Sequence, residues 1–170
     1  EYIDETSPHN GEIIIVDMGI QFPEENMPGI DYIIPNISSL LEKKKKIQGI
    51  VITHAHLDHI GAIPHLMPQL GTDIPIFGTD ITLAIIKKRQ EDYKDYALKL
   101  NLHVVTNETK MNLGIFKLEF FNVSHNIPGS LGVIINNPVG ILVHIGDFKI
   151  DLKSDIAGVT EIERLKDLGD

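Results

Sequence analysis

Four side chains that can bind a metal ion lie within six residues, directly after a short apolar run. The run is Ile50–Ile52, and the side chains are His54, His56, Asp58 and His59. A β-branched run bounded by glycine is typical of a buried strand, and the pattern after it predicts a helix that begins at Asp58. The ligands are therefore expected where a strand ends and a helix begins. An ordinary polar loop explains this density of histidine poorly.

The spacing of these residues divides them into two pairs. In an extended chain, residues i and i+2 point to the same side, so His54 and His56 can hold one ion together. The helix sends Asp58 and His59 in another direction, toward a second ion. Two ions about 3.5–4 Å apart can activate water and clamp a phosphate or an acyl group. Imidazole and carboxylate ligands without a thiolate favour zinc in an open site.

Composition limits the class of protein. The chain has 170 residues, of which 42% are apolar, and this suits one domain with a core. Its 15 basic and 24 acidic residues give a net charge of −9, which argues against binding nucleic acid by bulk charge. Two divalent ions would reduce the charge to about −5. Cysteine is absent, which excludes disulfides, thiolate zinc sites and cysteine nucleophiles.

The sequence contains no signal peptide and no long apolar run, so we expect a cytoplasmic protein without a membrane span. It begins at Glu1 rather than at methionine, so the natural start is expected to be missing.

Hydrophobic periodicity predicts a mixed α/β chain. The expected strands are 12–16, 50–52, 74–77, 102–106, 111–123, 131–135 and 141–145, and the expected helices are 37–46, 60–70 and about 79–98. The proline-rich stretch 21–36 is expected to form an ordered loop. Residues 153–170 are expected to form a surface helix or the lead into another domain.

Further ligand-capable residues follow other predicted strands. They are Asp17, His125 and Asp147, with His144 three residues before the last. Each alone could cap a turn, and Asp17 could instead orient a ligand histidine. Repetition of the pattern favours a site built at strand ends. By contrast, His65 is expected on the surface and His103 in a partly buried position. There is no phosphate-binding loop and no nucleophilic serine in a GxSxG setting.

The spacing His54-x-His56-x-Asp58-His59, followed by His125 and Asp147, resembles the metallo-β-lactamase superfamily. Longer stretches resemble ribonuclease J, a β-CASP member of that superfamily. These stretches are 17–25, 27–31, 34–35, 124–128 and 144–151.

The resemblance implies an αββα sandwich, here incomplete, with a dinuclear zinc site at one edge. His54, His56 and His125 would hold one zinc, Asp58 and His59 would hold the other, Asp147 would bridge them, and Asp17 and His144 would support the ligands. Asp58, His59 and Asp147 would take part in catalysis. Manganese is the alternative at the second position. The implied substrate is RNA, cut internally or trimmed from its 5′ end by a metal-bound hydroxide.

The resemblance also implies that residues 1–152 are the N-terminal part of a metallo-β-lactamase domain that a β-CASP domain interrupts. A further histidine ligand would come from downstream, as would any surface for a homo-oligomer. Ala55, Leu57, Asn126 and Gly129 depart from the family pattern but remove no ligand. Two alternatives stay open: a hydrolase of the same superfamily that acts on a thioester or lactam, or a metal-binding piece without turnover.

Overall fold

The computed structural model describes residues 1–96, 98–151 and 159–169. The elements in the first half are β1 (Ile13–Val16), α1 (Ser38–Glu42), the 3-10 helix η1 (Lys44–Lys46), β2 (Ile47–Val51), α2 (Leu57–Ile60), α3 (Ile63–Leu70), β3 (Pro75–Gly78) and α4 (Asp80–Gln90). The rest are the 3-10 helix η2 (Glu91–Tyr96), β4 (Asn101–Val104), β5 (Lys110–Leu113), β6 (Phe116–Asn122), β7 (Leu131–Asn137), β8 (Gly140–His144) and α5 (Ile162–Gly169).

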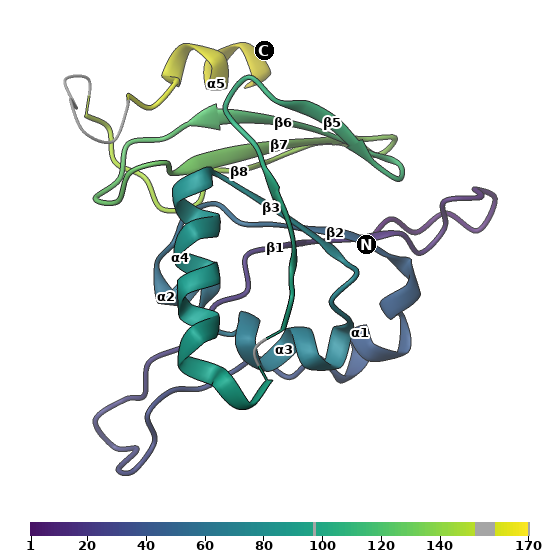
Figure 1. Ribbon diagram of the computed structural model, residues 1–170. Helices are drawn as coiled ribbons and strands as arrows, with labels where there is room; N and C mark the ends of the chain where they lie inside the picture. Colours follow the sequence, from purple (N-terminus) through teal and green to yellow (C-terminus); the bar gives the residue numbers. More distant parts are fainter. Residues whose placement is uncertain (97, 152–158, 170) are drawn as a thin grey trace.

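The strands form two sheets of different kinds. The first sheet is parallel, in the order β1-β2-β3-β4, and the second is antiparallel, in the order β5-β6-β7-β8. Helices α1, α3 and α4 lie against the outer side of the first sheet, and α5 lies over the second (Figure 1). The layers therefore follow the order helix, sheet, sheet, helix, which confirms the predicted αββα arrangement.

Strand β2 is buried on both faces. Ile50 and the following Ile52 pack among the helices, whereas Val51, between them, points toward the second sheet. This two-sided burial explains the continuous apolar run in the sequence, which is typical of parallel strands covered on both sides. Burial on both faces thus fixes β2 in place, together with the segment that follows it.

A third hydrophobic cluster holds α5 to the second sheet, because Leu165 of α5 packs against the cluster that contains Phe121 of β6.

Several predicted elements are shorter than expected. The helix expected at 79–98 ends at Gln90 and continues as η2, and the helix expected at 37–46 divides into α1 and η1. The ligand-bearing helix begins at Leu57, one residue early, and 60–70 divides between α2 and α3. The strand expected at 111–123 is a hairpin, because Gly114 turns the chain at a φ of 56°.

The C-terminal stretch is described only in part. Helix α5 lies within the predicted 153–170 stretch, whereas residues 153–158 lie outside the described residues. In the described parts of the chain, no helix combines the length and apolar character that crossing a bilayer requires.

Candidate metal centre

The predicted ligands come together at one edge of the sandwich. Strands β1 and β2 are parallel neighbours, so the residues that follow them, Asp17 and the 53–59 segment, emerge at the same edge. The second sheet joins this edge through a hydrogen bond from the Leu131 N–H to the Thr53 carbonyl, 3.0 Å long. His125 after β6 and Asp147 after β8 complete the set. Residues up to 93 positions apart in the chain, from 54 to 147, therefore face one another.

One group contains three imidazoles and a carboxylate. His54, His56, His125 and Asp147 each offer a ligand atom, and these atoms lie within 4.8 Å of one another. His54 Nε2 and His125 Nε2 each lie 3.1 Å from His56 Nδ1. His54 is fully buried, whereas the other three are partly buried.

A second group shares the same carboxylate. Asp58, His59 and Asp147 bring their ligand atoms within 4.8 Å of one another. The Oδ1 atom of Asp147 lies 3.4 Å from His59 Nε2, whereas its Oδ2 atom lies 3.7 Å from His125 Nε2. The two oxygens of one carboxylate therefore face the two groups, which is the arrangement that a bridging ligand needs.

The spacing of these atoms fits a metal ion. Nitrogen ligands at about 2.0–2.1 Å from a tetrahedral zinc lie about 3.3–3.4 Å apart, close to the 3.1 Å separations of the imidazole nitrogens here. The donors are imidazole and carboxylate, which suit zinc and other divalent transition metals. The first group offers four ligands and the second offers three.

Asp17 supports both groups from behind. Its Oδ1 accepts a hydrogen bond from the Thr53 N–H at 2.8 Å, and its Oδ2 accepts bonds from the Thr53 hydroxyl at 2.9 Å and from His59 Nδ1 at 2.7 Å. Burial alone would raise the pKa of Asp17, but the facing imidazoles of His144 and His59 and the Thr53 N–H outweigh it and hold the pKa at about 2. Asp17 is therefore ionised at neutral pH.

The same hydrogen bonds orient the ligand rings. Because the Thr53 hydroxyl donates to Asp17, it can accept from His54 Nδ1, which lies 3.0 Å away. Both His54 and His59 then carry their proton on Nδ1 and present a free Nε2 to the metal groups. Partners of this kind fix the tautomer and orientation of a ligand histidine. Asp17 and Thr53 thus act on the metal groups through two different rings.

The pKa values of the histidines are shifted in opposite directions. Burial lowers the pKa of His54 to about 4, and the neighbouring imidazoles of His59, His125 and His56 add to the effect. Burial and the nearby His56 also lower the pKa of His125. For His59, the hydrogen bond to Asp17 and the surrounding carboxylates outweigh burial and raise the pKa. Neutral imidazole is the form that binds metal, and His54 is held in that form.

The backbone at Asp17 is special. Asp17 has a φ of 62°, the only positive value among the described residues other than glycine. The next residues pack directly on α2: the Met18 N–H bonds the His59 carbonyl at 2.7 Å. Gly19 permits this approach, because a Cβ there would lie 1.6 Å from the Asp58 carbonyl oxygen. Strained backbone of this kind is common at functional sites.

Of the remaining histidines, His144 lies near the centre. Its Nε2 is 3.7 Å from Asp17 Oδ2 and has no hydrogen-bond partner by the distance criterion in the described part of the chain. His103 is exposed and bonds Asn101, so the prediction of partial burial is wrong. His65 is half-buried between the rings of Tyr32 and Tyr93 rather than on the surface.

Sequence reasoning missed two supporting residues. Thr53 lies between the apolar run and His54, and a hydroxyl next to the first ligand is a usable signal. Thr160 lies far along the chain, is 3% exposed, accepts a bond from the Ser124 N–H and donates to the Lys149 carbonyl. It thereby connects the segments that carry His125 and Asp147, and nothing in its sequence context indicated this role.

Comparison with known proteins defines the family. Residues 27–162 match the sequence model of the beta-lactamase superfamily domain. The chain belongs to this superfamily. Two solved structures share the fold at low sequence identity: an Enterococcus faecalis protein of unknown function (TM-score 0.57, 18% identity, 81% of this chain and 38% of that one) and the short form of human tRNase Z (TM-score 0.52, 20% identity, 81% and 59%).

Within the superfamily, the chain is similar to ribonuclease J. It is 39% identical to ribonuclease J of Thermus thermophilus over 144 residues, which cover 82% of this chain and 25% of that protein. It is 37% identical to ribonuclease J of Mycolicibacterium smegmatis over 162 residues, covering 95% and 28%. The expected resemblance is confirmed, and the chain spans about a quarter of the length of these curated relatives.

Proposed function

We propose that this chain forms the metal-binding part of a zinc-dependent ribonuclease that hydrolyses phosphodiester bonds in RNA. The observation that carries the proposal is the pair of ligand groups joined by Asp147, on a chain 37–39% identical to ribonuclease J. Similarity to ribonuclease J favours RNA over a thioester or a lactam as the substrate. Internal cleavage and trimming from the 5′ end are both compatible with such a site.

In this proposal, His54, His56 and His125 hold one ion, Asp58 and His59 hold the other, and Asp147 bridges. Two bound divalent ions would supply Lewis acidity and an activated water for attack on phosphorus. The protein's own residues hold the ligands in place: Asp17 keeps His59 oriented and Thr53 keeps His54 oriented. Zinc is the expected ion at both positions, with manganese as the alternative at the second.

The exposure of the ligands leaves the second group open to substrate. The side chains of Asp58 and Asp147 are 51% and 47% exposed, against 14% for His59. A phosphate could therefore approach from the Asp58 and Asp147 side. Since the chain carries a net charge of −9, attraction of RNA would depend on bound cations and on any further part of the protein.

The wider assignments remain proposals. Residues 1–152 would be the N-terminal part of a metallo-β-lactamase domain, and 153–170 would lead toward a β-CASP domain. RNA is the proposed partner, a homo-oligomer would form through regions outside this sequence, and the cytoplasm is the proposed location.

The deciding experiment measures metal content per chain after dialysis together with cleavage of a 5′-monophosphorylated RNA. Bound zinc with cleavage supports the proposal in full. One zinc without cleavage supports the metal site and assigns turnover to a longer protein. Absence of any bound metal from the folded chain would contradict the proposal.

A further inference from the structure

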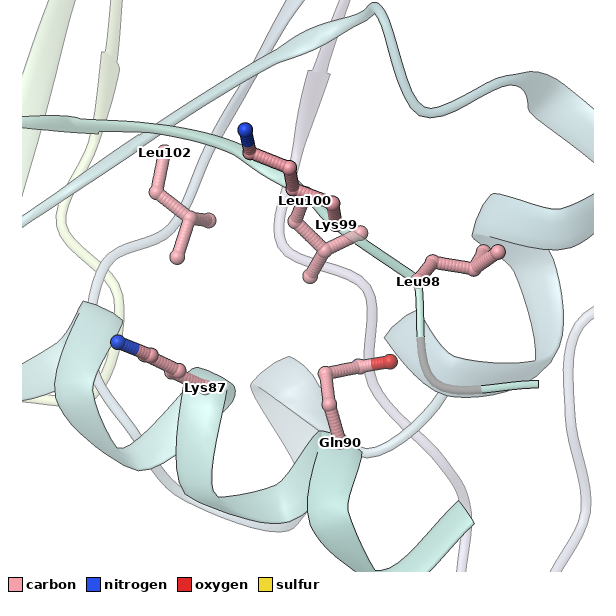
Figure 2. A pocket seen from close by; sticks show the side chains of 6 residues that line it. All are labelled: Lys87, Gln90, Leu98, Lys99, Leu100 and Leu102. Carbon is pink, nitrogen blue, oxygen red and sulfur yellow. The ribbon is translucent and has the colours of Figure 1, made fainter. Parts of the chain in front are cut away.

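A second candidate site lies in the groove between α4 and β4, at the open edge of the first sheet. The pocket has a volume of about 320 Å³ and is lined by Lys87, Gln90, Leu98, Lys99, Leu100 and Leu102. Figure 2 shows the side chains of Leu100 and Leu102 facing those of Gln90 and Lys87 across the gap. Its size is at the lower end of the range for small-molecule sites, which are mostly apolar with a few placed polar groups.

The innermost polar group of this pocket lacks a partner. Gln90 is only 7% exposed, yet its Nε2 has no hydrogen bond in the described part of the chain. Buried amide groups are nearly always hydrogen-bonded, because leaving a donor unpaired costs free energy. A bound molecule with an acceptor atom in its buried portion would satisfy this donor.

Lys87 lies on the α4 side of the pocket, whereas the side chain of Lys99 points away from the gap, on the other side of the chain from Leu100 (Figure 2). Lys87 and Lys99 are exposed, and neither forms an ion pair within the described residues, unlike the adjacent Lys88, which pairs with Glu91. The free ammonium group of Lys87 beside an apolar wall favours a ligand with an anionic head that stays near water.

These features specify the chemistry of the ligand. The leucines Leu98, Leu100 and Leu102 require an apolar or flat body, Gln90 requires an acceptor within that body, and Lys87 favours an anionic head. A fatty acid has its only acceptors in the head, so it would leave Gln90 unpaired. A nucleobase provides both a flat face and carbonyl or ring-nitrogen acceptors.

We propose that the pocket between α4 and β4 binds a nucleoside monophosphate, with the base on the leucines and against Gln90 and the phosphate near Lys87. The choice of a nucleotide rests in part on the proposed function, because RNA hydrolysis can release such molecules. The pocket itself is defined without reference to the metal centre, since none of the ligand residues lines it.

Metal-free protein provides the test, because a nucleotide could otherwise bind at the metal centre. Uridine and adenosine monophosphates are titrated into EDTA-treated protein, and amide chemical shifts locate the binding while calorimetry measures it. We expect shifts at residues 98–102 and in the Gln90 side-chain amide. Uridine, inorganic phosphate and octanoate are each expected to bind at least about tenfold more weakly, because each lacks at least one of the three contacts.

Two variants test the contacts of Gln90 and Lys87 separately. Gln90→Leu replaces the amide with an apolar side chain of similar size and is expected to weaken nucleotide binding about tenfold without lowering the unfolding midpoint. Lys87→Glu is expected to weaken binding by a similar factor and to reduce its salt dependence. Lys45→Glu makes the same charge change on an exposed lysine of η1 and is expected to leave binding unchanged.

Other results would overturn the proposal. These are unmoved signals at about 10 mM nucleotide, equal binding by Gln90→Leu and the parent, or octanoate binding more tightly than either nucleotide. Nucleotide shifts confined to residues 54–59 would assign binding to the metal centre instead. Metal content and RNA cleavage do not depend on Gln90, so either proposal can fail while the other stands.

Discussion

The two halves of the metal centre use similar ligands but are anchored differently. The first half places the fully buried His54 among His56 and His125, and both sheets contribute to it. The second half rests on Asp58, with a side chain 51% exposed, and on His59, which Asp17 holds from behind. The first half is therefore fixed by the fold itself, whereas the second depends on one carboxylate outside the ligand set.

Loss of His54 is expected to have the largest effect. His54→Ala removes a buried ligand and leaves the first half with two imidazoles, so we expect loss of the tightly bound metal and of any RNA cleavage, by about 1,000-fold or more. Metal content after dialysis and cleavage rate measure the two effects.

Two variants serve as controls for this prediction. His103→Ala changes an exposed histidine on β4 and should retain metal. Asp58→Asn should weaken only the second half and leave about one ion per chain. Retention of both ions by His54→Ala would show that the two halves do not differ as proposed.

Acidification is expected to weaken the two halves in separate pH ranges. The pKa of His54 falls from its ordinary 6.5 to about 4 in the fold, so the unfolded chain takes up this proton first. Metal-free protein should therefore lose stability as the pH falls from about 6.5 toward 4, by up to about 3 kcal/mol. For Asp17, with a pKa lowered from 3.8 to about 2, stability is present above 3.8 and is lost toward 2.

His59 changes the pH dependence of stability in the opposite sense. Its raised pKa contributes stability that is complete below the ordinary histidine pKa and is lost as the pH rises through the folded value. Urea unfolding of EDTA-treated protein at several pH values measures the sum. His54→Ala should flatten the dependence between pH 6.5 and 4 and leave the lower range intact. An equal slope in the variant and the parent would refute the assignment to His54.

The two halves also differ in what the sequence could predict. The pair of ligand sets and the bridging position of Asp147 followed from local spacing and family resemblance, and the structure brings these residues together. Their use as metal ligands remains a prediction. The order of the layers followed from the family resemblance, whereas hydrophobic periodicity predicted the individual strands and helices.

Some features were not predictable from local patterns. The division of 111–123 at Gly114 depends on one glycine in a left-handed conformation, inside a run that reads as a single strand. The end of α4 at Gln90 lies within a stretch whose local pattern continues. The contact of Thr160 with Ser124 spans 36 residues, and such long-range hydrogen bonds leave no periodic signal. Supporting residues are thus harder to predict than ligands.

Neutralising the support of the second half is expected to have the next largest effect. Asp17→Asn keeps the size of the side chain, and asparagine tolerates the φ of 62° at this position. It removes the charge that holds His59, so we expect the second ion to bind about 10–100-fold more weakly, while the first is less affected. Calorimetric zinc titration of metal-free protein resolves the two steps, and equal weakening of both would contradict the comparison.

The smallest effect is expected at Thr53, which links the two halves. Thr53→Val removes the hydroxyl that donates to Asp17 and accepts from His54 Nδ1, while the backbone N–H still bonds the carboxylate. The site is buried, with Thr53 2% exposed, so His54 Nδ1 would lose its partner at a cost of about 1–2 kcal/mol. We expect this cost to appear as weaker zinc binding in the first half, by about tenfold. Thr53→Ser keeps the hydroxyl and should restore affinity. If valine and serine bind zinc equally well, the ligand rings are held by packing alone, and the hydrogen-bonded support is confined to the second half.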